Sequence, residues 1–557
     1  MDKLSLENKS TLMMRLGQLK AERATWYPSW QELSMYLLPR NGRYFRQDHN
    51  KGWKREQSIY DNTASRALEV LSAGLMSGLT SPARPWFRLA TSDPDLNQSN
   101  AVRIWMAHCT RLMLDIFARS NTYRALHDIY REIVTFGTAV NILGQDYDMV
   151  IYHYPVTTGE YCLAQDYQGK VNTIYREFEK PVATLVSEFG YENCSTAVRN
   201  LYDRGSLDQW IPIIHGIEPR KDRDPSKKDA LNMAYKSVYF EIGADETKPL
   251  RVSGYETFPG LAPRWAVAGG DIYGNGPGIQ CIGDIKQLQQ EQLRKSQAID
   301  YMTNPPLQVP SQLKNREVDR LPGGVTYYDT NSQSPGIKTM FDVALDINAL
   351  GSDIMDVRQR INSSFYVDLF LMIANDQRSG VTATEIAQKQ EEKMLMLGPV
   401  LERLHNELLD PLITYTFDKM LKGGLLPPPP PELQGQNLNV ELISILAQAQ
   451  RAVATNGIDR FVSSLGAIAQ FKPDVLDKFD ADQWADIYSD MLGVDPELIT
   501  ADEKVALIRK QRAQAQAQAT QMQGAQMAAD TAQKLGNTPV NNGNGTALDA
   551  INQFSGY

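Results

Sequence analysis

The sequence predicts an α+β protein that is mainly helical. Apolar residues recur at helical spacing over about the first 140 residues, strand patterns occupy Ile142 to Val267, and long polar helical segments follow Gly278. With 557 residues, 42% of them hydrophobic, the chain can form about three to four domain-sized units.

The N-terminal part is predicted as amphipathic helices. Leucines and tryptophans recur every three or four residues from Leu12 to Leu37, and Pro39 ends the pattern. After a polar, basic loop, Asp61 and Asn62 are placed to cap the next helix. The apolar faces of this helix and two further ones are Leu68, Leu71, Leu75 and Leu79; Val102, Trp105, Cys109, Leu112 and Ile116; and Leu126, Ile129, Ile133 and Val140.

The strand-rich part contains a hairpin, in which Glu160 to Gln165 and Lys170 to Glu179 flank the turn Asp166 to Gly169. A short helical segment, Pro181 to Leu201, separates this hairpin from further strands in WIPIIHGIEPR and SVYFEIG. His215, inside the first of these runs, is interpreted as a hydrogen-bonded structural histidine.

The strands end at GDIYGNGPG, Gly270 to Gly278, which leads into a polar helix ending at Asn304. Glycines before a helix resemble a phosphate-binding loop, but the Lys-Ser/Thr that such a loop requires is missing, and Asp284 and Ile285 follow Gly283. We therefore interpret the segment as a structural hinge formed by Gly274, Gly276, Pro277 and Gly278.

The second half continues with strand and turn signals up to Phe341 and a helix from Asp346 to Ser363. Thr382 and Glu385 form a capping box that starts a long helix ending at Lys422. Pro399 and Pro411 predict kinks near Leu395 and Glu407.

The C-terminal part begins with a polyproline connector, Gly423 to Leu433, and continues as a helical region from Val440 to about Met527. Its last part is nearly pure alanine and glutamine, which is typical either of a low-complexity tail or of an ordered helix packed against copies of itself. We favour the ordered helix.

Composition restricts the function. A net charge of −9 argues against a protein that binds DNA tightly through its phosphates, but allows one past which DNA slides. The N-terminus lacks a signal sequence, and the longest apolar run, Phe365 to Ala374, is half a bilayer span, so we expect a cytosolic product without membrane contact.

Catalytic and metal-binding patterns are weak, and no cofactor is implied. No two histidines have metal-ligand spacing, and the four cysteines are most simply reduced, buried thiols. The D-x-D pairs Asp146/Asp148, Asp222/Asp224 and Asp480/Asp482 could hold magnesium, although solvated surface acids are the simpler interpretation.

Four motifs, in this order and spacing, resemble the portal, or head-to-tail connector, proteins of short-tailed tailed phages. They are WYPSWQELSMYLLPR (Trp26 to Arg40), YDNTASRALEVLSAGLMSGLTSPARPWFRL (Tyr60 to Leu89), RWAVAGGDIYGNGPG (Arg264 to Gly278) and TATEIAQKQEEKMLMLGPVLERLHNELLDPLI (Thr382 to Ile413). The similarity extends from Trp26 to about Arg509.

The resemblance implies a non-enzymatic portal fold that assembles as a ring, usually of twelve subunits, at one vertex of the virion capsid. It divides the chain into a wing (1–278), stem helices (279–304 and 346–367), a clip (305–345), a tunnel loop (368–381), a kinked wing helix with the connector (382–439), and a crown with an alanine/glutamine-rich C-terminal helix (440–557). Double-stranded DNA passes through such rings without sequence readout, driven by a separate terminase. Further implied partners are tail or adaptor, major capsid, scaffolding and internal core or ejection proteins.

Candidate channel residues come from the stem and the tunnel loop. Their polar and mixed-charge character suits a conduit that does not retain DNA. The stem set is Asp284, Gln287, Glu291, Arg294 and Lys295, and the loop set is Asn375, Asp376, Gln377, Arg378 and Ser379.

Two readings of Arg378 stay open, since it either touches phosphates or pairs with Asp376 or Glu385. At the level of the whole chain, a metal-dependent nuclease of the packaging machinery and a capsid adaptor without a channel are the alternative functions.

Overall fold

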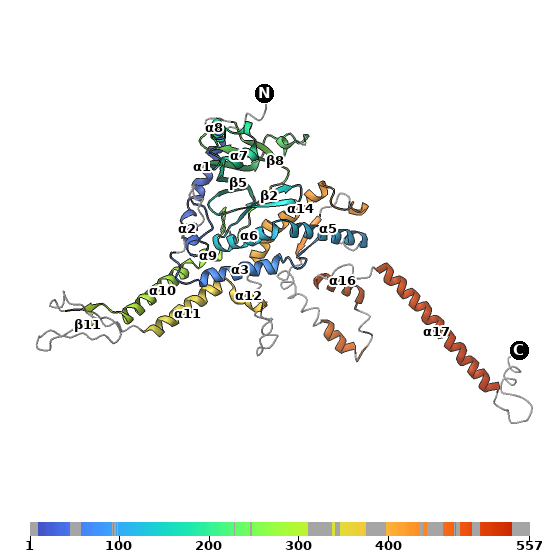
Figure 1. Cartoon of the computed structure of the whole chain (residues 1–557). Helices are drawn as coiled ribbons and strands as arrows, with labels where there is room; N and C mark the ends of the chain where they lie inside the picture. The colour runs from blue at the N-terminus through green and yellow to red at the C-terminus, as the bar shows by residue number, and fades with distance from the viewer. Residues whose placement is uncertain are drawn as a thin grey trace, which may run out of the picture.

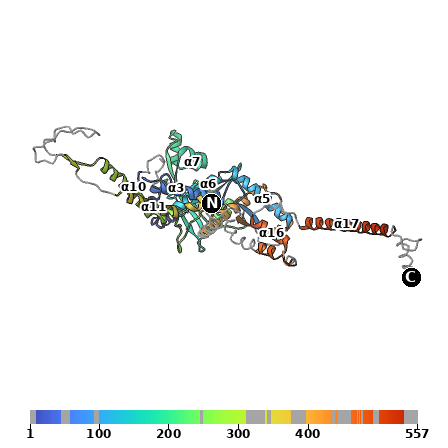
Figure 2. The same ribbon diagram turned by 90° about the horizontal axis from the view of Figure 1, so that it is seen from below.

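The structure is a computed structural model in which a folded body carries two projecting parts (Figure 1). It describes residues 9–44, 57–91, 99–227, 229–244, 248–309, 337–339, 346–374, 397–433, 438–442, 461–469, 479–492 and 502–536, together with 93, 96, 471, 472 and 474. Helices α10 and α11 project from one end of the body and α17 from the other, as the view from below also shows (Figure 2).

The predicted N-terminal helices are present. Leu68, Leu71 and Leu75 of α3 are fully buried in the main core, as are Leu126 and Ile133 of α6, which packs against α3. The bounds are α1 Lys9–Arg23, α2 Tyr27–Tyr36, α3 Thr63–Leu79, α5 Asn100–Arg119 and α6 Thr122–Phe136.

Two antiparallel sheets follow these helices, and both confirm the predicted strand-rich region. One has the order β3-β2-β9 and the other β4-β5-β6-β7-β8. Their bounds are β2 Val140–Asp146, β3 Val150–Val156, β9 Gly260–Leu261, β4 Tyr161–Gln165, β5 Val171–Pro181, β6 Trp210–Pro219, β7 Tyr235–Glu241 and β8 Arg251–Tyr255.

The hairpin of β4 and β5 has the predicted turn. Gly169 has a φ of 79°, and Asp166 Oδ1 accepts hydrogen bonds from the N–H groups of Gln168 and Lys170 at 2.9 Å each. Local sequence therefore specifies this register.

Helices cover both faces of the five-stranded sheet. Leu12, Leu16 and Leu19 of α1 pack on one face. The short helices α7 (Val182–Phe189) and α8 (Thr196–Asp203), which fall within the predicted helical segment, pack on the other.

A third pairing joins distant parts of the chain. Strand β1 (Phe87–Thr91) pairs antiparallel with β12 (Leu438–Leu442). The sequence patterns predicted neither strand, and the expectation that a helical region begins at Val440 is wrong, because that residue lies within β12. The backbone of each strand is hydrogen-bonded to a segment far away in the sequence, and the local pattern of apolar residues does not indicate such a pairing.

The first projection consists of two antiparallel helices, α10 (Ile282–Thr303) and α11 (Ile347–Ser364), which we call the arm. A short helix, α9 (Pro277–Gln280), precedes α10, so the helix predicted from Ile279 is interrupted at Cys281. The two-residue strands β10 (Leu307–Gln308) and β11 (Lys338–Thr339) pair at the outer end of the arm. Clip residues 310–336 and 340–345 lie outside the described ranges.

The C-terminal half starts again at residues 397–404, which are helical, followed by a π-helical turn, His405–Leu409, and α14 (Asp410–Lys422). The predicted helix end at Lys422 is confirmed. Further on lie α16 (Ala481–Leu492) and the projecting α17 (Asp502–Gly536), which shows that the alanine/glutamine-rich segment is helical.

Candidate functional site

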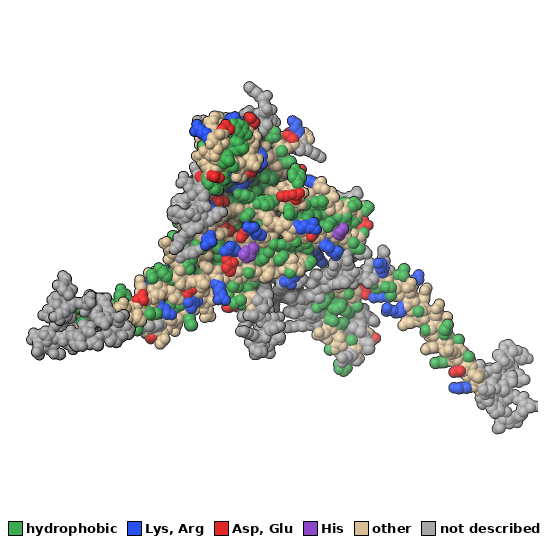
Figure 3. Space-filling view, in the orientation of Figure 1, with side chains coloured by type: hydrophobic (Ala, Val, Ile, Leu, Met, Phe, Trp, Pro, Cys, Tyr) green, Lys and Arg blue, Asp and Glu red, His purple; other side chains and the backbone are tan. Residues whose placement is uncertain are grey.

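The arm carries balanced charge along its length. Helix α10 contains three basic and three acidic residues, and α11 contains two of each, so each helix has a net charge of zero. Basic and acidic side chains are interspersed on its surface (Figure 3). A surface of this kind offers polar contacts to a polyanion but has no excess of positive charge that would bind it tightly.

The predicted stem residues are at different places on α10. Asp284 contacts α11, where its Oδ1 lies 3.2 Å from Arg360 Nη1. Gln287 is exposed and donates a hydrogen bond to Glu291 Oε1 at 2.6 Å. Arg294 is exposed and Lys295 is half-buried. Asp284 therefore joins the two helices, and the other residues lie on the polar part of α10.

Asp61 links both helices of the arm to α3. Its Oδ1 accepts hydrogen bonds from the N–H and hydroxyl groups of Thr63 at 2.8 and 2.5 Å. Its Oδ2 accepts from Arg358 of α11 at 2.6 and 3.1 Å and from Gln292 of α10 at 3.0 Å. Gln289, also of α10, accepts from the Asp61 N–H and donates to the Asp61 carbonyl.

This contact revises the expected helix cap. Asn62, at the N-cap position, makes no side-chain cap hydrogen bond, and Asp61 caps α3 from one residue earlier. Burial acts to raise the pKa of Asp61, but the hydrogen bonds from Thr63 and Arg358 outweigh it and hold the pKa below its usual range. Asp61 is thus an ionised link between the body and the arm.

The glycines before α9 allow two backbones to touch. None of Gly274, Gly276 and Gly278 has a positive φ, so left-handed freedom is not the reason for glycine here. A Cβ at these three positions would lie 2.3 Å from Gly137 O, 2.8 Å from Ile133 O and 2.5 Å from Thr135 O, respectively. Pro277 is the first residue of α9, a position that suits proline.

The amides of this loop are used within the chain. The Gly274 N–H donates to Thr138 Oγ1 and the Asn275 N–H donates to Ala266 O, both at 2.7 Å. This agrees with the rejection of a phosphate-binding loop.

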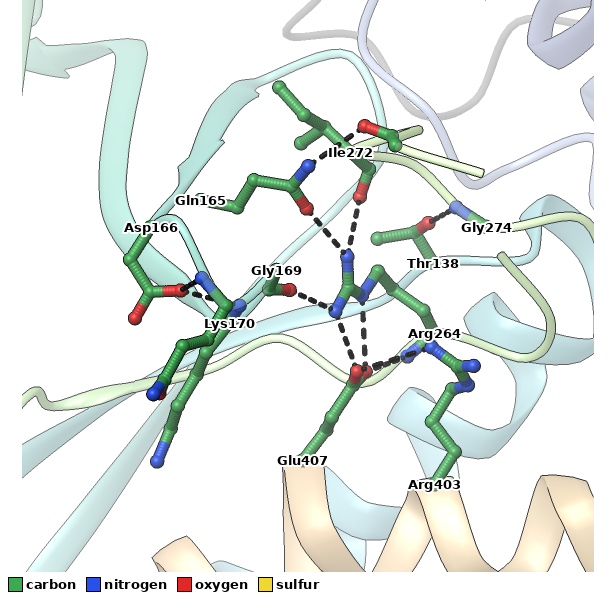
Figure 4. Close-up of polar contacts among 12 residues, drawn as sticks. Thr138, Gln165, Asp166, Gly169, Lys170, Arg264, Ile272, Gly274, Arg403 and Glu407 are labelled. Carbon is green, nitrogen blue, oxygen red and sulfur yellow. Dashed lines mark hydrogen bonds and ion pairs between the residues drawn. The ribbon is translucent and has the colours of Figure 1, made fainter. Parts of the chain in front are cut away.

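Arg264, at the start of the same motif, is a residue that the sequence did not single out. It is 3% exposed, and its guanidinium donates five hydrogen bonds (Figure 4). Two go to Glu407 at 2.6 and 3.2 Å, and the other acceptors are Gln165 Oε1, Gly169 O and Ile272 O. The Arg264 N–H also donates to Glu407, at 2.9 Å.

Glu407 reaches Arg264 from the π-helical turn. Pro411 has no N–H with which to bond the Glu407 carbonyl, and the wider turn lies directly before it. The structure therefore has a π-helical turn where a kink was predicted near Glu407, whereas the kink predicted near Leu395 lies outside the described residues. Arg403 Nη1 is 3.6 Å from the same carboxylate.

The predicted tunnel loop is only partly described. Residues 368–374, expected to begin the loop, belong instead to helix α12 (Val367–Ala374). Packing of its apolar side chains against α3 stabilises this helix. Phe370 lies so close to α3 that a Cβ at Gly74 would be 2.2 Å from its ring. The loop residues Asn375, Asp376, Gln377, Arg378 and Ser379, and the cap residues Thr382 and Glu385, lie outside the described ranges.

The D-x-D pairs have local roles. Asp146 Oδ1 accepts from the N–H groups of Asp148 and Met149 in the β2–β3 turn, and Asp480 Oδ1 caps α16. Asp224 Oδ1 accepts from the N–H and hydroxyl groups of Ser226. Over the described part of the chain, no three His, Cys, Asp or Glu side chains are grouped as metal ligands would be.

His215 is a buried structural histidine, as predicted. Its Nδ1 accepts from Arg176 Nε at 3.1 Å, and its Nε2 is 2.9 Å from Ser237 Oγ. Burial, followed by the positive charge of Arg176, lowers its pKa well below the usual value.

The cysteines Cys109, Cys162, Cys194 and Cys281 are all free and buried, which confirms the predicted reduced thiols. Burial raises the pKa of the Cys109 and Cys281 thiols to about 12. Among the helices that the structure describes, none combines the length and apolar composition needed to cross a membrane.

Comparisons with known proteins identify the family. Residues 9–499 match the family of the bacteriophage head to tail connecting protein. The probable portal protein of Bordetella phage BPP-1 is 59% identical, over 99% of both chains, and the portal protein of Salmonella phage epsilon15 is 44% identical, over 98% of both. A solved chain from the virion of a native gene transfer agent particle aligns with 78% of this chain and 90% of its own, with a TM-score of 0.31 and 10% identity. The resemblance seen in the four motifs is confirmed: this chain belongs to the bacteriophage head-to-tail connecting protein family, and its function is that of a portal protein.

Proposed function

We propose that this portal protein assembles as a ring, of twelve subunits as the family resemblance suggests, at one capsid vertex of the virion. Double-stranded DNA passes through the ring during packaging and ejection without sequence readout. The observation that carries this proposal is the arm, a pair of antiparallel helices with zero net charge that projects from the folded body.

Several contacts hold the arm against the body. Asp61 ties α10 and α11 to α3, while the glycine contacts place α9 against α6. Lys286 of α10 also bonds Glu32 of α2 at 2.5 Å. A channel wall built from copies of this arm would keep its position while DNA moves past it.

The proposed partners follow from this place in the virion. The terminase large subunit docks during packaging, and tail or adaptor proteins replace it afterwards. Major capsid, scaffolding and internal core or ejection proteins surround the ring. In this assignment α10 and α11 are the stem, residues 305–345 the clip and the segment after α12 the tunnel loop.

Assembly is tested by the mass of the purified chain over a range of protein concentrations and by electron microscopy. We expect a closed ring with a bore wide enough to admit a DNA duplex. A chain that stays monomeric contradicts the proposal, and a ring with a narrower bore favours a structural adaptor.

Charge in the channel is tested with Gln287→Lys, which adds one cation per subunit on the exposed side of α10. We expect packaging at low salt to slow by about twofold or more, with partial recovery as ions screen the added charge. Gln287→Glu is the matched control and should not slow packaging. Equal rates for the two variants would place Gln287 outside the channel.

Arg378→Ala tests the tunnel loop. We expect reduced packaging or retention of DNA in rings that assemble normally, since the proposed role is contact with backbone phosphates. Electron microscopy of the variant rings and the length of packaged DNA measure the two effects. Failure of assembly would assign Arg378 to a structural ion pair instead.

A further inference from the structure

One face of the five-stranded sheet carries a row of cationic and aromatic side chains that the proposed channel does not use. Arg176, His215, Tyr239 and Arg251 are directly paired across β5, β6, β7 and β8. Directly paired residues project from the same face of a sheet. This is the face on which α7 and α8 pack, since Tyr239 belongs to their cluster.

Arg176 is fixed from several sides. Its guanidinium carbon lies 4.2 Å from the Tyr154 ring centroid and 4.4 Å from that of Phe178. Its Nε donates to His215, whose ring stacks on Tyr239 with centroids 3.8 Å apart. The side chain is 6% exposed, so its position is set by packing rather than by solvent.

The charge of Arg176 has no acidic partner within the described residues. The bond from Nε to His215 is the only hydrogen bond that the guanidinium makes to a described residue, which leaves both terminal nitrogens without an acceptor there. Neither terminal nitrogen is among the described polar atoms that lack both a partner and solvent contact, so each keeps some contact with solvent.

The surroundings add positive charge. The positive charges of Arg251 and Lys180 both lower the pKa of His215, as the charge of Arg176 does. Glu188 pairs with Lys180 and lies 3.7 Å from Arg251, so one carboxylate serves two cations. Buried charges are costly unless they are paired, and among the described residues no carboxylate pairs with Arg176.

We propose that a carboxylate from a neighbouring copy of this chain completes the site, binding the terminal nitrogens of Arg176 in a bidentate pair. The planar fork of a guanidinium fits a carboxylate in this way. The chain has acids to supply, with 66 Asp and Glu against 57 Lys and Arg. The inference rests on the proposed ring, which places copies side by side.

Arg176→Gln tests the assignment through assembly. We expect the protein concentration at which half of the chains are in rings to rise about tenfold or more, because the variant loses a charge-assisted pair between subunits. Arg176→Lys keeps the charge but not the fork, so its effect should be smaller. Arg223→Gln, in an exposed loop, is the matched control and should assemble like the wild type. Sedimentation velocity measures assembly, and thermal unfolding of unassembled chains checks folding.

Inorganic phosphate serves as a probe of the open site. At equal ionic strength, phosphate should raise the unfolding temperature of unassembled wild-type chains relative to chloride, and should have no such effect on Arg176→Gln or on rings. Phosphate binding that is equal in rings and free chains would overturn the neighbouring carboxylate in favour of a free oxyanion.

Ring formation by Arg176→Gln at wild-type concentrations would also overturn the inference, while leaving the proposed function intact. A wild-type chain that forms no ring contradicts the proposed function itself, and with it the neighbouring copy. The phosphate result then reports separately on whether Arg176 binds an oxyanion.

Discussion

Glu407 supplies the negative charge for an arginine that is almost completely enclosed. Glu407→Ala leaves Arg264 with neutral acceptors only, so we expect the free energy of unfolding to fall by about 3 kcal/mol. Denaturant unfolding followed by circular dichroism measures the loss. Arg403→Ala removes a more exposed cation beside the same carboxylate and should cost less than about 1 kcal/mol. Similar losses for the two variants would contradict the importance of the Arg264 pair.

His153 makes stability depend on pH. Burial lowers its pKa to about 4, below the value of about 6.5 expected after unfolding. As the pH falls through about 6.5 the unfolded chain binds a proton first, so stability is lost progressively down to about pH 4. His215, whose pKa is also lowered, acts in the same direction.

The His153 contribution amounts to about 3 kcal/mol when fully lost. His153→Gln should reduce the difference in unfolding temperature between about pH 7 and about pH 5. The exposed His108 provides the control, and His108→Gln should leave that difference unchanged. An unaltered pH profile in His153→Gln would show that other groups dominate.

At the scale of elements, the contact between the loop before α9 and the end of α6 depends on glycine. A Cβ at Gly276 or Gly278 would lie within 2.8 Å of a backbone oxygen, so Gly276→Ala and Gly278→Ala should each destabilise the protein by about 1 to 3 kcal/mol. Gly283→Ala, in α10, meets no atom within 4 Å and should be neutral or stabilising by up to about 1 kcal/mol. Thermal unfolding of the three variants provides the comparison, and uniform effects would refute it.

Asp61 holds the arm against the body. Asp61→Ala removes the acceptor for Arg358 and Gln292 and should cost about 2 kcal/mol, less than a fully buried pair because Arg358 is partly exposed. Limited proteolysis should cut the arm faster while the remaining body stays resistant. Asp300→Ala, on the exposed surface of α10, is the control. Unchanged cleavage in Asp61→Ala would mean that packing alone holds the arm.

The elements that the sequence predicted are those with local signals. Helix α6 has apolar residues at helical spacing, and the β4–β5 turn has its own Asp and Gly. The sequence could not pair Arg264 with Glu407, because 143 residues separate them and the two motifs in which they lie do not show that these side chains meet. The same applies to β1 and β12. Most of helix α12 was predicted as loop, because the start of the tunnel loop was placed at residue 368, before the polar residues that follow the helix.

The arm shows the same division. Its helices and their polar character follow from the sequence, whereas the buried Gln289 and its contact with Asp61 depend on how α10 meets α3. The position of Gln289 beside the apolar residues Ile285 and Leu288 was the feature of the sequence that could have indicated its burial.

At the scale of the whole molecule, α17 contributes little to the stability of one chain. It is about 50 Å long. Apart from the half-buried Val505, its side chains are exposed wherever their burial is described, including Leu507 and Met522. Deleting residues 502–557 should leave the unfolding temperature of unassembled chains unchanged, because the Arg509–Asp482 ion pair is exposed. Rings should lose stability if α17 packs against its copies, as its sequence suggests. A large fall in the unfolding temperature of unassembled chains would show instead that α17 packs on the body.

The pairing of β1 with β12 affects how the chain matures on the ribosome. The two strands are separated by about 350 residues, so at about 5 to 20 residues per second β1 waits about 20 to 70 s for its partner to be synthesised. During that interval its edge N–H and C=O groups are available to any other extended chain. Nascent copies on one messenger are the nearest such chains, so the rate of translation helps to decide how much of the product folds correctly.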